Sequence, residues 1–479
     1  MVDQSRPAIV PTPQMEPRTL QFLADASGGR LLQGVPETLA TGLSTDTRNL
    51  LARDLYVALS GDRFDGHRFV GDAIARGASA VLVQEDRVPT ECDGVGVIAV
   101  DDPRRALGRL AARYREDFIL PLIAVGGSNG KTTVKELLTS VLRQQFRTLS
   151  SKASFNNDVG VPITLLELDS THEVGVLEVG TNHPGELAPL VRMVKPRHGI
   201  ITSIGREHLE FFGDLDGVVA EEGSLAEALP AGGSLYVNGD CPEMDGIERR
   251  TRARVIRVGS SDSSQWRVQK FQMHKTGVSF HVDAPDAAFG GDYSLNLLGR
   301  HQAVNALFAA AVGMELGLSR AALQRGLTDC SSPAMRLQLR AGHDCLVLDD
   351  SYNANEDSMR AAIRTLMDLP GEGDRVAVLG DMAELGQHTA AAHQAVGRCA
   401  AESGVASLYA VGRMAAVTAE GARQAGMDEV FEFDGVEQAG EALLDRVGSG
   451  AIVLVKGSRS CRLERLIEML VGGKSRVAK

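Results

Sequence analysis

One stretch decides the fold of this chain: Pro121-Leu-Ile-Ala-Val-Gly-Gly-Ser-Asn-Gly-Lys-Thr-Thr133. The apolar run Pro121–Val125 has the character of a buried strand, and the pattern from Val134 to Phe146 predicts a helix. Glycines between the two let consecutive backbone N–H groups turn inward onto an anion, and the helix adds its positive N-terminal end. A strand, a glycine-rich turn and a helix in this order predict a phosphate-binding loop in an α/β protein.

The residues of this loop that we predict to bind ATP are Gly127, Ser128, Asn129, Gly130, Lys131, Thr132 and Thr133. Lys131 supplies a mobile positive charge, and Thr132 supplies a hydroxyl for Mg²⁺. The common spacing G-x-x-x-x-G-K-[ST] needs a glycine at position 125, where Val125 stands, so the loop is one residue tighter. A glycine-rich surface turn with an incidental lysine is the less favoured interpretation.

The composition is that of a soluble globular protein with two or three domains, since the chain has 479 residues, 43% hydrophobic and 23% charged. A net charge of -12 without a basic run argues against nucleic acid as a partner. No apolar run approaches the roughly 18–20 residues of a membrane span, and the N-terminus lacks the apolar core of a signal peptide. The six cysteines are scattered, as expected of reduced thiols in a cytoplasmic protein.

Strand and helix patterns predict an α/β fold of three domains. The period switches to two around Trp266–Val282, which indicates a local antiparallel excursion. We predict a central domain with a parallel sheet around the phosphate loop and a C-terminal, Rossmann-like, doubly wound sheet. The predicted boundaries are 1–17 for a flexible lead-in, 18–116 for a small α/β domain, 117–331 for the central domain and 332–479 for the C-terminal domain.

Two side chains follow the strands after the phosphate loop. Glu178 lies at the end of the strand-like run Val174–Val179, and His208 follows the run His198–Ile204. Considered alone, Glu178 could equally be a surface carboxylate and His208 an ordinary loop histidine. Their shared position after successive strands favours a ligand site, because open α/β sheets bind ligands at the carboxyl ends of their strands. A carboxylate there suits Mg²⁺, which prefers oxygen ligands.

The tight loop resembles that of the Mur ligase and folylpolyglutamate synthase superfamily. The stretches Ser154-Phe-Asn-Asn-Asp-Val-Gly-Val-Pro162, Leu177-Glu-Val-Gly-Thr-Asn-His183 and Glu207-His-Leu-Glu210 are similar to the central domain of the Mur ligases. This resemblance implies that Glu178 and His208 bind magnesium ions. It also implies that Asn156 and Asn157, which otherwise read as turn residues, lie in the substrate-binding region.

Further stretches resemble the same family and extend the implied ATP site. Leu298–Ala306 implies that Asn305 contacts adenine, and Pro333–Leu337 implies that Arg336 reaches the ATP phosphates. Read alone, Asn305 begins a packed helix and Arg336 is a solvated charge.

Two more stretches imply contacts with the substrates. The stretch Leu348-Asp-Asp-Ser-Tyr-Asn-Ala-Asn355 implies that Asp350 binds ribose. The N-terminal stretch Ser44-Thr-Asp-Thr-Arg48 resembles the part of the family that binds a UDP substrate, which implies substrate-binding roles for Ser44 and Arg48.

One position departs from the family. Fourteen residues after the magnesium-binding histidine the family usually has a lysine, carbamylated so that it presents a carboxylate to a second Mg²⁺. Glu222 stands there in this chain. We expect Glu222 to supply that carboxylate directly; a solvated helix face is the alternative for Glu221 and Glu222.

The stretch Leu348–Asn355 also resembles the family members that add D-alanyl-D-alanine. The implied reaction is an ATP-dependent ligation in peptidoglycan synthesis: the terminal carboxylate of UDP-N-acetylmuramoyl-tripeptide is phosphorylated, and the amine of D-alanyl-D-alanine attacks the acyl phosphate. The resemblance implies catalytic roles for Lys131, Glu178, His208 and Arg336, and we expect a monomer. The alternatives are a family member that adds a single amino acid, a folylpolyglutamate synthase, a P-loop NTPase, and an inactive binding module.

Overall fold

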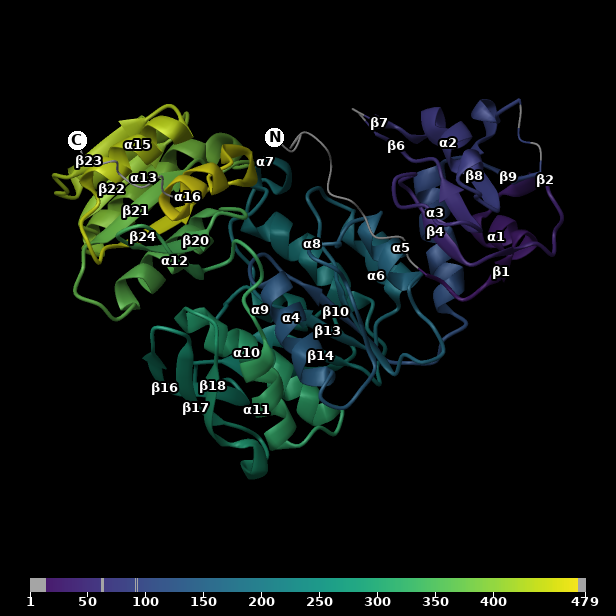
Figure 1. Ribbon diagram of the computed structural model, residues 1–479. Coiled ribbons are helices and arrows are strands. Elements are labelled where there is room, and N and C mark those ends of the chain that lie inside the picture. Colours follow the sequence, from purple (N-terminus) through teal and green to yellow (C-terminus); the bar gives the residue numbers. More distant parts are fainter. Residues whose placement is uncertain (1–13, 62–63, 91, 93, 473–479) are drawn as a thin grey trace. The chain divides into compact units, whose positions relative to one another are not determined.

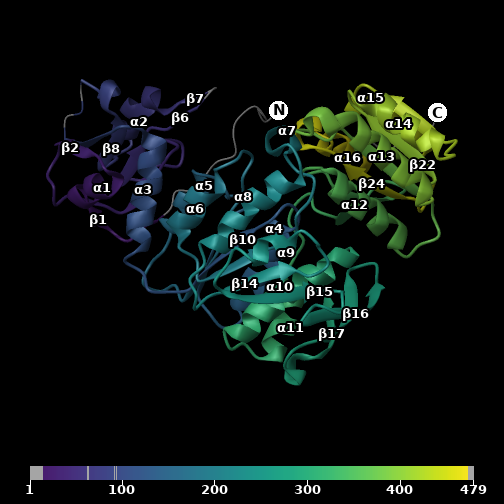
Figure 2. The same ribbon diagram turned by 180° about the vertical axis from the view of Figure 1, so that it is seen from behind.

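The computed structural model describes residues 14–61, 64–90, 92 and 94–472. The chain divides into two compact units. The first unit comprises the residues up to Ala124 with 146–181 and 186–198, and the second comprises 125–145, 182–185 and the residues from Gly199 onward. Three main sheets follow one another along the chain (Figure 1, and from behind in Figure 2).

Of the predicted lead-in 1–17, residues 1–13 lie outside the described residues. Met15 is buried, and the backbone N–H of Glu16 donates a hydrogen bond of 2.8 Å to the hydroxyl of Tyr114. This part of the lead-in is therefore packed against helix α3 (Pro103–Arg115).

The N-terminal sheet has five strands in the order β2-β9-β8-β5-β4. Its strands β4, β5, β8 and β9 are parallel, and β2 pairs antiparallel with β9. Helix α3 begins at Pro103, because Asp102 caps its first backbone N–H groups and proline is favoured in the first helical turn. The elements here are β1 (Arg18–Thr19), α1 (Leu20–Ser27), β2 (Arg30–Gln33), β3 (Leu39–Ala40), β4 (Gly42–Ser44), β5 (Asp54–Val57), β6 (Ser60–Gly61), β7 (Phe64–Asp65), α2 (Val70–Ala75), β8 (Ala80–Gln84), β9 (Gly96–Val100) and α3.

The central sheet has nine strands in the order β11-β12-β10-β13-β14-β15-β16-β17-β18. The predicted antiparallel excursion is confirmed, since β16 pairs antiparallel with β17 and β17 with β18. The strands are β10 (Leu122–Gly126), β11 (Thr148–Ser150), β12 (Val174–Glu178), β13 (His198–Ile201), β14 (Ser234–Asn238), β15 (Arg254–Gly259), β16 (Trp266–Met273), β17 (Val278–Asp283) and β18 (Gly291–Leu295). The helices are α4 (Lys131–Leu142), α5 (Gly160–Leu165), α6 (Leu187–Val194), α7 (Leu209–Phe212), α8 (Leu215–Glu227), α9 (Met244–Glu248), α10 (Arg300–Glu315) and α11 (Arg320–Asp329).

Helix α4 begins three residues earlier than predicted, at Lys131 rather than Val134. Gly130 precedes it with a φ of 93°, a left-handed conformation that glycine adopts without a steric cost. The turn is complete at Gly130, so Lys131 and Thr132 already belong to the first helical turn. Their side chains therefore start from a helix, which fixes them better than a loop would.

The C-terminal sheet has six strands in the order β19-β20-β24-β21-β22-β23, all parallel except the edge pair β19 and β20. Alternate strand residues face opposite sides: Leu348 and Ala377 pack with α12, α13 and α14, whereas Val347 and Val378 pack with α15 and α16. Helices on both faces of a parallel sheet confirm the predicted doubly wound fold. The elements are β19 (Gln338–Ala341), β20 (Leu346–Asp350), α12 (Glu356–Asp368), β21 (Arg375–Gly380), α13 (Thr389–Glu402), β22 (Ser407–Val411), α14 (Ala415–Gln424), β23 (Val430–Phe433), α15 (Val436–Arg446), β24 (Ile452–Lys456) and α16 (Glu464–Val471).

Two further predictions concern membrane-spanning helices and the state of the cysteines. In the part of the chain that the structure describes, no helix combines the length and the apolar character that crossing a membrane requires. The six cysteines are all thiols, as predicted from their scattered positions.

Helix α4 is held in place by close packing against α11. A Cβ atom added at Gly326 would lie 2.4 Å from Cα of Val141, and the carbonyl of Gly326 accepts a hydrogen bond of 2.6 Å from Ser140. Glycine at 326 therefore allows the two backbones to approach.

We predict that Gly326→Ala lowers the free energy of unfolding by about 1–3 kcal/mol, because the methyl group overpacks this contact. Gly71→Ala is the matched control, since a Cβ there meets nothing within 4 Å in helix α2. It is expected to change stability by up to about 1 kcal/mol in the favourable direction. Thermal unfolding of both variants measures this, and a melting temperature for Gly326→Ala at or above the wild-type value would contradict the packing account.

Candidate active site

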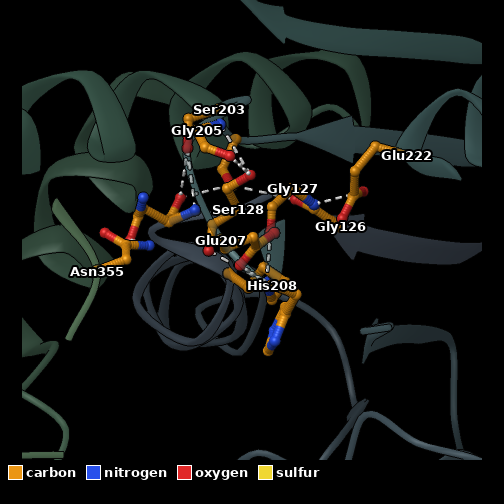
Figure 3. Close-up of polar contacts among 12 residues, drawn as sticks. Gly126, Gly127, Ser128, Ser203, Gly205, Glu207, His208, Glu222 and Asn355 are labelled. Carbon is orange, nitrogen blue, oxygen red and sulfur yellow. Dashed lines mark hydrogen bonds and ion pairs between the residues drawn. The ribbon is translucent and has the colours of Figure 1, made fainter. Parts of the chain in front are cut away.

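The phosphate loop of the second unit is fixed by hydrogen bonds to the segment that follows β13 (Figure 3). The N–H of Ser128 donates to the carbonyl of Ser203 at 2.8 Å, and the N–H of Asn129 donates to the hydroxyl of Ser203 at 3.0 Å. The hydroxyl of Ser128 accepts from the N–H of Gly205 at 2.9 Å. The loop is therefore held in shape by the chain segment that leads to His208.

Lys131 folds back over its own loop. Its ammonium group donates to the carbonyls of Gly127 and Ser128, the second at 3.2 Å, and lies 3.6 Å from a carboxylate oxygen of Glu207. Glu207 is 8% exposed, so this ion pair is shielded from water. Glu207 stands beside His208 in the sequence and was not among the predicted site residues.

Glu222 contacts the phosphate loop directly. It lies on α8, its side chain is buried, and its Oε2 accepts a hydrogen bond of 2.8 Å from the backbone N–H of Gly127. Among the described residues, its Oε1 has no hydrogen-bond partner. Burial raises the pKa of Glu222 to about 7, against the attraction of Lys131.

The alternative interpretation of Glu221 and Glu222 as a solvated helix face is wrong. Glu221 is also buried, and it accepts a hydrogen bond of 2.7 Å from the N–H of Gly185. Two adjacent carboxylates on one helix therefore bind two backbone N–H groups from separate segments.

Glu178 belongs to the first unit, at the end of β12. It is 1% exposed, and its Oε1 accepts a hydrogen bond of 2.9 Å from the side-chain amide of Asn156. Its Oε2 is buried and has no hydrogen-bond partner among the residues that the structure describes. Asn157 shapes the next turn, since its Oδ1 accepts from the N–H groups of Val159 and Gly160. Asn156 therefore orients a carboxylate, whereas Asn157 has a local structural contact.

His208 precedes helix α7 in a left-handed backbone conformation with a φ of 49°. Its Nδ1 lies 2.5 Å from a carboxylate oxygen of Glu384, a residue of the C-terminal sheet region. The hydrogen bond from His208 lowers the pKa of Glu384. Nothing in the sequence pattern linked these two residues, which lie 176 positions apart.

Two predicted ATP-binding residues from outside the phosphate loop, Arg336 and Asn305, lie next to it or to the first turn of α4. The guanidinium of Arg336 donates to the hydroxyl of Thr132 at 3.2 Å and stacks 4.4 Å from the ring centre of Tyr352. Asn305 lies beside Gly130, where an added Cβ would be 3.1 Å from its Oδ1. Arg336 is thus stacked and directed at the loop.

Asp350 has two partners inside the C-terminal region. One oxygen pairs with the ammonium of Lys456 at 2.7 Å, and the other accepts from the N–H of Leu337 at 3.2 Å. Lys456 is almost completely buried, so it fixes the end of β20 from the neighbouring strand β24. Lys456 was not among the site residues predicted from the sequence.

Ser44 and Arg48, predicted to bind substrate, build one turn after β4 in the first unit. The hydroxyl of Ser44 donates to the carbonyl of Asp46 at 2.8 Å, and the guanidinium of Arg48 makes a bidentate ion pair with the Asp46 carboxylate. The hydrogen bond from Arg48 lowers the pKa of Asp46.

The donor set suits Mg²⁺ bound together with phosphates. Within the described residues no three His, Cys, Asp or Glu side chains are grouped closely enough to hold a metal alone. Mg²⁺ is commonly held by one or two carboxylates plus substrate phosphates. Among the described residues, Glu222 of the second unit presents a buried oxygen without a hydrogen-bond partner, and so, in the first unit, does Glu178. The N–H groups of Gly127, Ser128 and Asn129 donate within the protein. The N-terminal end of helix α4, Lys131 and Arg336 are therefore the groups that favour an anion such as a triphosphate.

Family models match three consecutive parts of the chain. The Mur ligase family catalytic domain matches residues 40–115, the Mur ligase middle domain matches 125–313, and the Mur ligase glutamate ligase domain matches 335–459.

Individual relatives resemble the chain over nearly its full length. It is 36% identical to the UDP-N-acetylmuramoyl-tripeptide--D-alanyl-D-alanine ligase of Escherichia coli (strain K12), over 94% of this chain and 98% of that protein. A crystal structure of MurF from Acinetobacter baumannii is 30% identical, covers 95% of this chain and 99% of its own, and superposes with a TM-score of 0.87. MurF ligase from Thermotoga maritima in complex with ADP shares the fold at 23% identity, with a TM-score of 0.77 over 89% of this chain and 96% of its own. With the family models matching in order and a relative at this identity across both chains, the chain belongs to the Mur ligase family.

Proposed function

We propose that this chain is an ATP-dependent ligase that joins D-alanyl-D-alanine to UDP-N-acetylmuramoyl-tripeptide during peptidoglycan precursor synthesis. The observation that carries the proposal is the phosphate loop, which Lys131 contacts directly and whose following helix Arg336 reaches at Thr132. The similarity to the Escherichia coli ligase over 94% of this chain supports the same proposal. The product feeds cell-wall synthesis, so loss of the activity is expected to affect cell shape and division. We further propose that the protein acts in the cytoplasm as a monomer.

The chemistry needs charge neutralisation more than a nucleophile. A carboxylate is a poor electrophile, and transfer of the γ-phosphoryl group of ATP to it creates an acyl phosphate with a good leaving group. The amine of the dipeptide then forms the amide bond, and phosphate leaves. Such a reaction depends on positioning and on cationic groups around the phosphates, which Lys131 and Arg336 supply here.

Four side chains of this chain would hold Mg²⁺: Thr132, Glu178, His208 and Glu222. Bound Mg²⁺ neutralises phosphate charge and orients the phosphate oxygens. Glu178 and Glu222 each have a buried oxygen with no hydrogen-bond partner among the described residues, which supports this assignment, because such an oxygen is costly to bury unless something binds it.

Glu222 replaces the lysine that the family usually carbamylates at this position. It offers a carboxylate from the same helix without a carbamate, so this chain needs no CO₂ to complete its second metal site. Its hydrogen bond to Gly127 supports the assignment, since it places the carboxylate at the start of the phosphate loop.

The remaining predicted contacts belong to the same proposal. Asn305 would contact adenine and Asp350 the ribose of ATP. Ser44 and Arg48 would meet the uridine end of the substrate, and Asn156 and Asn157 would lie by its peptide. For Arg48 this requires exchange of its ion pair with Asp46 for substrate, which an arginine with a partly exposed side chain can do.

A first test is phosphate release by the purified protein with Mg-ATP, UDP-N-acetylmuramoyl-tripeptide and D-alanyl-D-alanine. We expect release to require all three, since the acyl phosphate forms only on the tripeptide and is resolved by the dipeptide. The product should be heavier than the UDP substrate by the dipeptide less one water. Release with ATP alone would favour the P-loop NTPase, and release with a single amino acid in place of the dipeptide would favour another Mur ligase.

Glu222→Gln tests the metal assignment. We expect at least about a 100-fold loss of kcat, with a higher Mg²⁺ concentration for half-maximal rate, because the amide loses the charge that faces the cation. Glu227→Gln is the matched control on the same helix, where the side chain is 55% exposed. Mn²⁺ binding measured by electron paramagnetic resonance provides a readout apart from turnover.

Glu222→Lys extends the same test. We expect this variant to be inactive in CO₂-free buffer and to regain activity with added bicarbonate. Unchanged activity and unchanged Mg²⁺ dependence in Glu222→Gln would remove Glu222 from the metal site.

A further inference from the structure

Two residues with left-handed backbones meet where the loop after β13 touches the C-terminal region. His208 has a φ of 49° and Glu384 a φ of 60°. Residues other than glycine adopt this conformation at a cost that surrounding contacts must offset, and such residues cluster at functional sites. Here each left-handed residue directs its side chain at the other.

Glu384 holds this segment at two points. Its carboxylate lies 2.5 Å from Nδ1 of His208, and its backbone carbonyl accepts a hydrogen bond of 3.1 Å from the N–H of Glu210. His388 adds a contact of 3.2 Å to the carbonyl of Gly213. The turn 384–388 therefore forms hydrogen bonds at both ends of helix α7. These contacts fix the backbone around His208, and the contact with Glu384 fixes its side chain.

The contact with Glu384 decides which ring nitrogen of His208 carries the proton. A carboxylate only accepts hydrogen bonds, so Nδ1 must carry the hydrogen that it shares with Glu384. In the neutral imidazole the lone pair then lies on Nε2, the nitrogen that remains to bind a cation. Metal-binding histidines are commonly oriented in this way by a carboxylate on their other nitrogen.

We propose that Glu384 is a positioning residue that keeps His208 in the Nδ1–H tautomer with Nε2 ready for Mg²⁺. The inference rests on the proposed role of His208 as a metal ligand. Because Glu384 follows β21 of the C-terminal sheet, the histidine is prepared for metal only while that region is docked on the loop after β13. Docking of the C-terminal region is thereby coupled to assembly of the metal site.

The first readout is the tautomer of His208, observed by nuclear magnetic resonance of ring-¹⁵N-labelled histidine in the full-length protein without metal or nucleotide. The signal is assigned by its loss in His208→Asn. We expect wild type and Glu384→Gln to show the Nδ1–H form, since the amide oxygen still accepts. Glu384→Ala and Glu384→Asp, which cannot reach Nδ1, should shift toward the Nε2–H form.

A matched control distinguishes a weaker contact between the two regions from a change in the tautomer of His208. Asp357 of α12 accepts a hydrogen bond of 2.9 Å from the N–H of Arg206, which joins the loop after β13 to another part of the C-terminal region without touching His208. We expect Asp357→Asn to leave the tautomer unchanged. The side chain of Glu384 is 46% exposed, so its truncation leaves no buried cavity and the variants are expected to fold.

The second readout is the Mg²⁺ concentration for half-maximal phosphate release. We expect this Mg²⁺ concentration to rise about 10- to 100-fold in Glu384→Ala, whereas the KM for the UDP-substrate stays unchanged. The value for Glu384→Gln should lie between those of wild type and Glu384→Ala. If His208→Asn leaves the Mg²⁺ dependence unchanged, the metal role of His208 fails. If His208→Asn changes it while Glu384→Ala keeps both the tautomer and the Mg²⁺ dependence of wild type, the positioning role of Glu384 is overturned.

Discussion

The hydrogen bond from the backbone N–H of Gly127 to the carboxylate of Glu222 is the contact on which the site depends. It joins the first turn of the phosphate loop to helix α8 and directs one carboxylate oxygen at the loop. The other oxygen is buried and has no hydrogen-bond partner in the part of the chain that the structure describes. A charge so placed is unfavourable by itself, as the raised pKa of Glu222 shows. Lys131 offsets part of that cost, and a divalent cation would offset more.

Three further contacts of the second unit bring distant parts of the chain to the phosphate loop, to the first turn of α4 and to the segment after β13. Arg336 reaches Thr132, the side-chain amide of Asn355 donates to Asn129 at 3.1 Å, and Glu384 reaches His208. These three residues come from the linker before the C-terminal sheet or from the turns that follow its strands. Arg336 and Asn355 contact the phosphate loop or the first turn of α4 directly, and Glu384 contacts the segment after β13 that supports the loop. Phosphate binding at the loop, as proposed, would therefore affect the C-terminal region.

The sequence predicted what is local. The strand, glycine-rich turn and helix of the phosphate loop, the antiparallel excursion and the doubly wound C-terminal sheet all follow from short-range pattern and turn chemistry. The start of α4 was misplaced because Lys131 and Thr132 read as loop residues, while the left-handed Gly130 already ends the turn.

The long-range contacts could not be predicted in the same way. The burial of Glu221 and Glu222 depends on segments that fold over α8, and Asn129 and Asn355 lie 226 positions apart. Family resemblance singled out Arg336, Asn305 and Asp350, yet it gave no reason to select Glu207, Glu384 or Lys456. Those three act through partners that only the tertiary structure brings near.

The central claim is that a carboxylate is activated by phosphorylation, and transfer of an isotope tests it most directly. The UDP-N-acetylmuramoyl-tripeptide would carry ¹⁸O at both oxygens of its reacting carboxylate, and the released phosphate and the product would be analysed by mass spectrometry. The account predicts one ¹⁸O in the phosphate and one in the new amide. When the amine displaces phosphate from the acyl phosphate, the acyl group keeps one carboxylate oxygen and the phosphate leaves with the other. Phosphate without ¹⁸O would mean that water takes the phosphoryl group, and it would contradict the ligase mechanism.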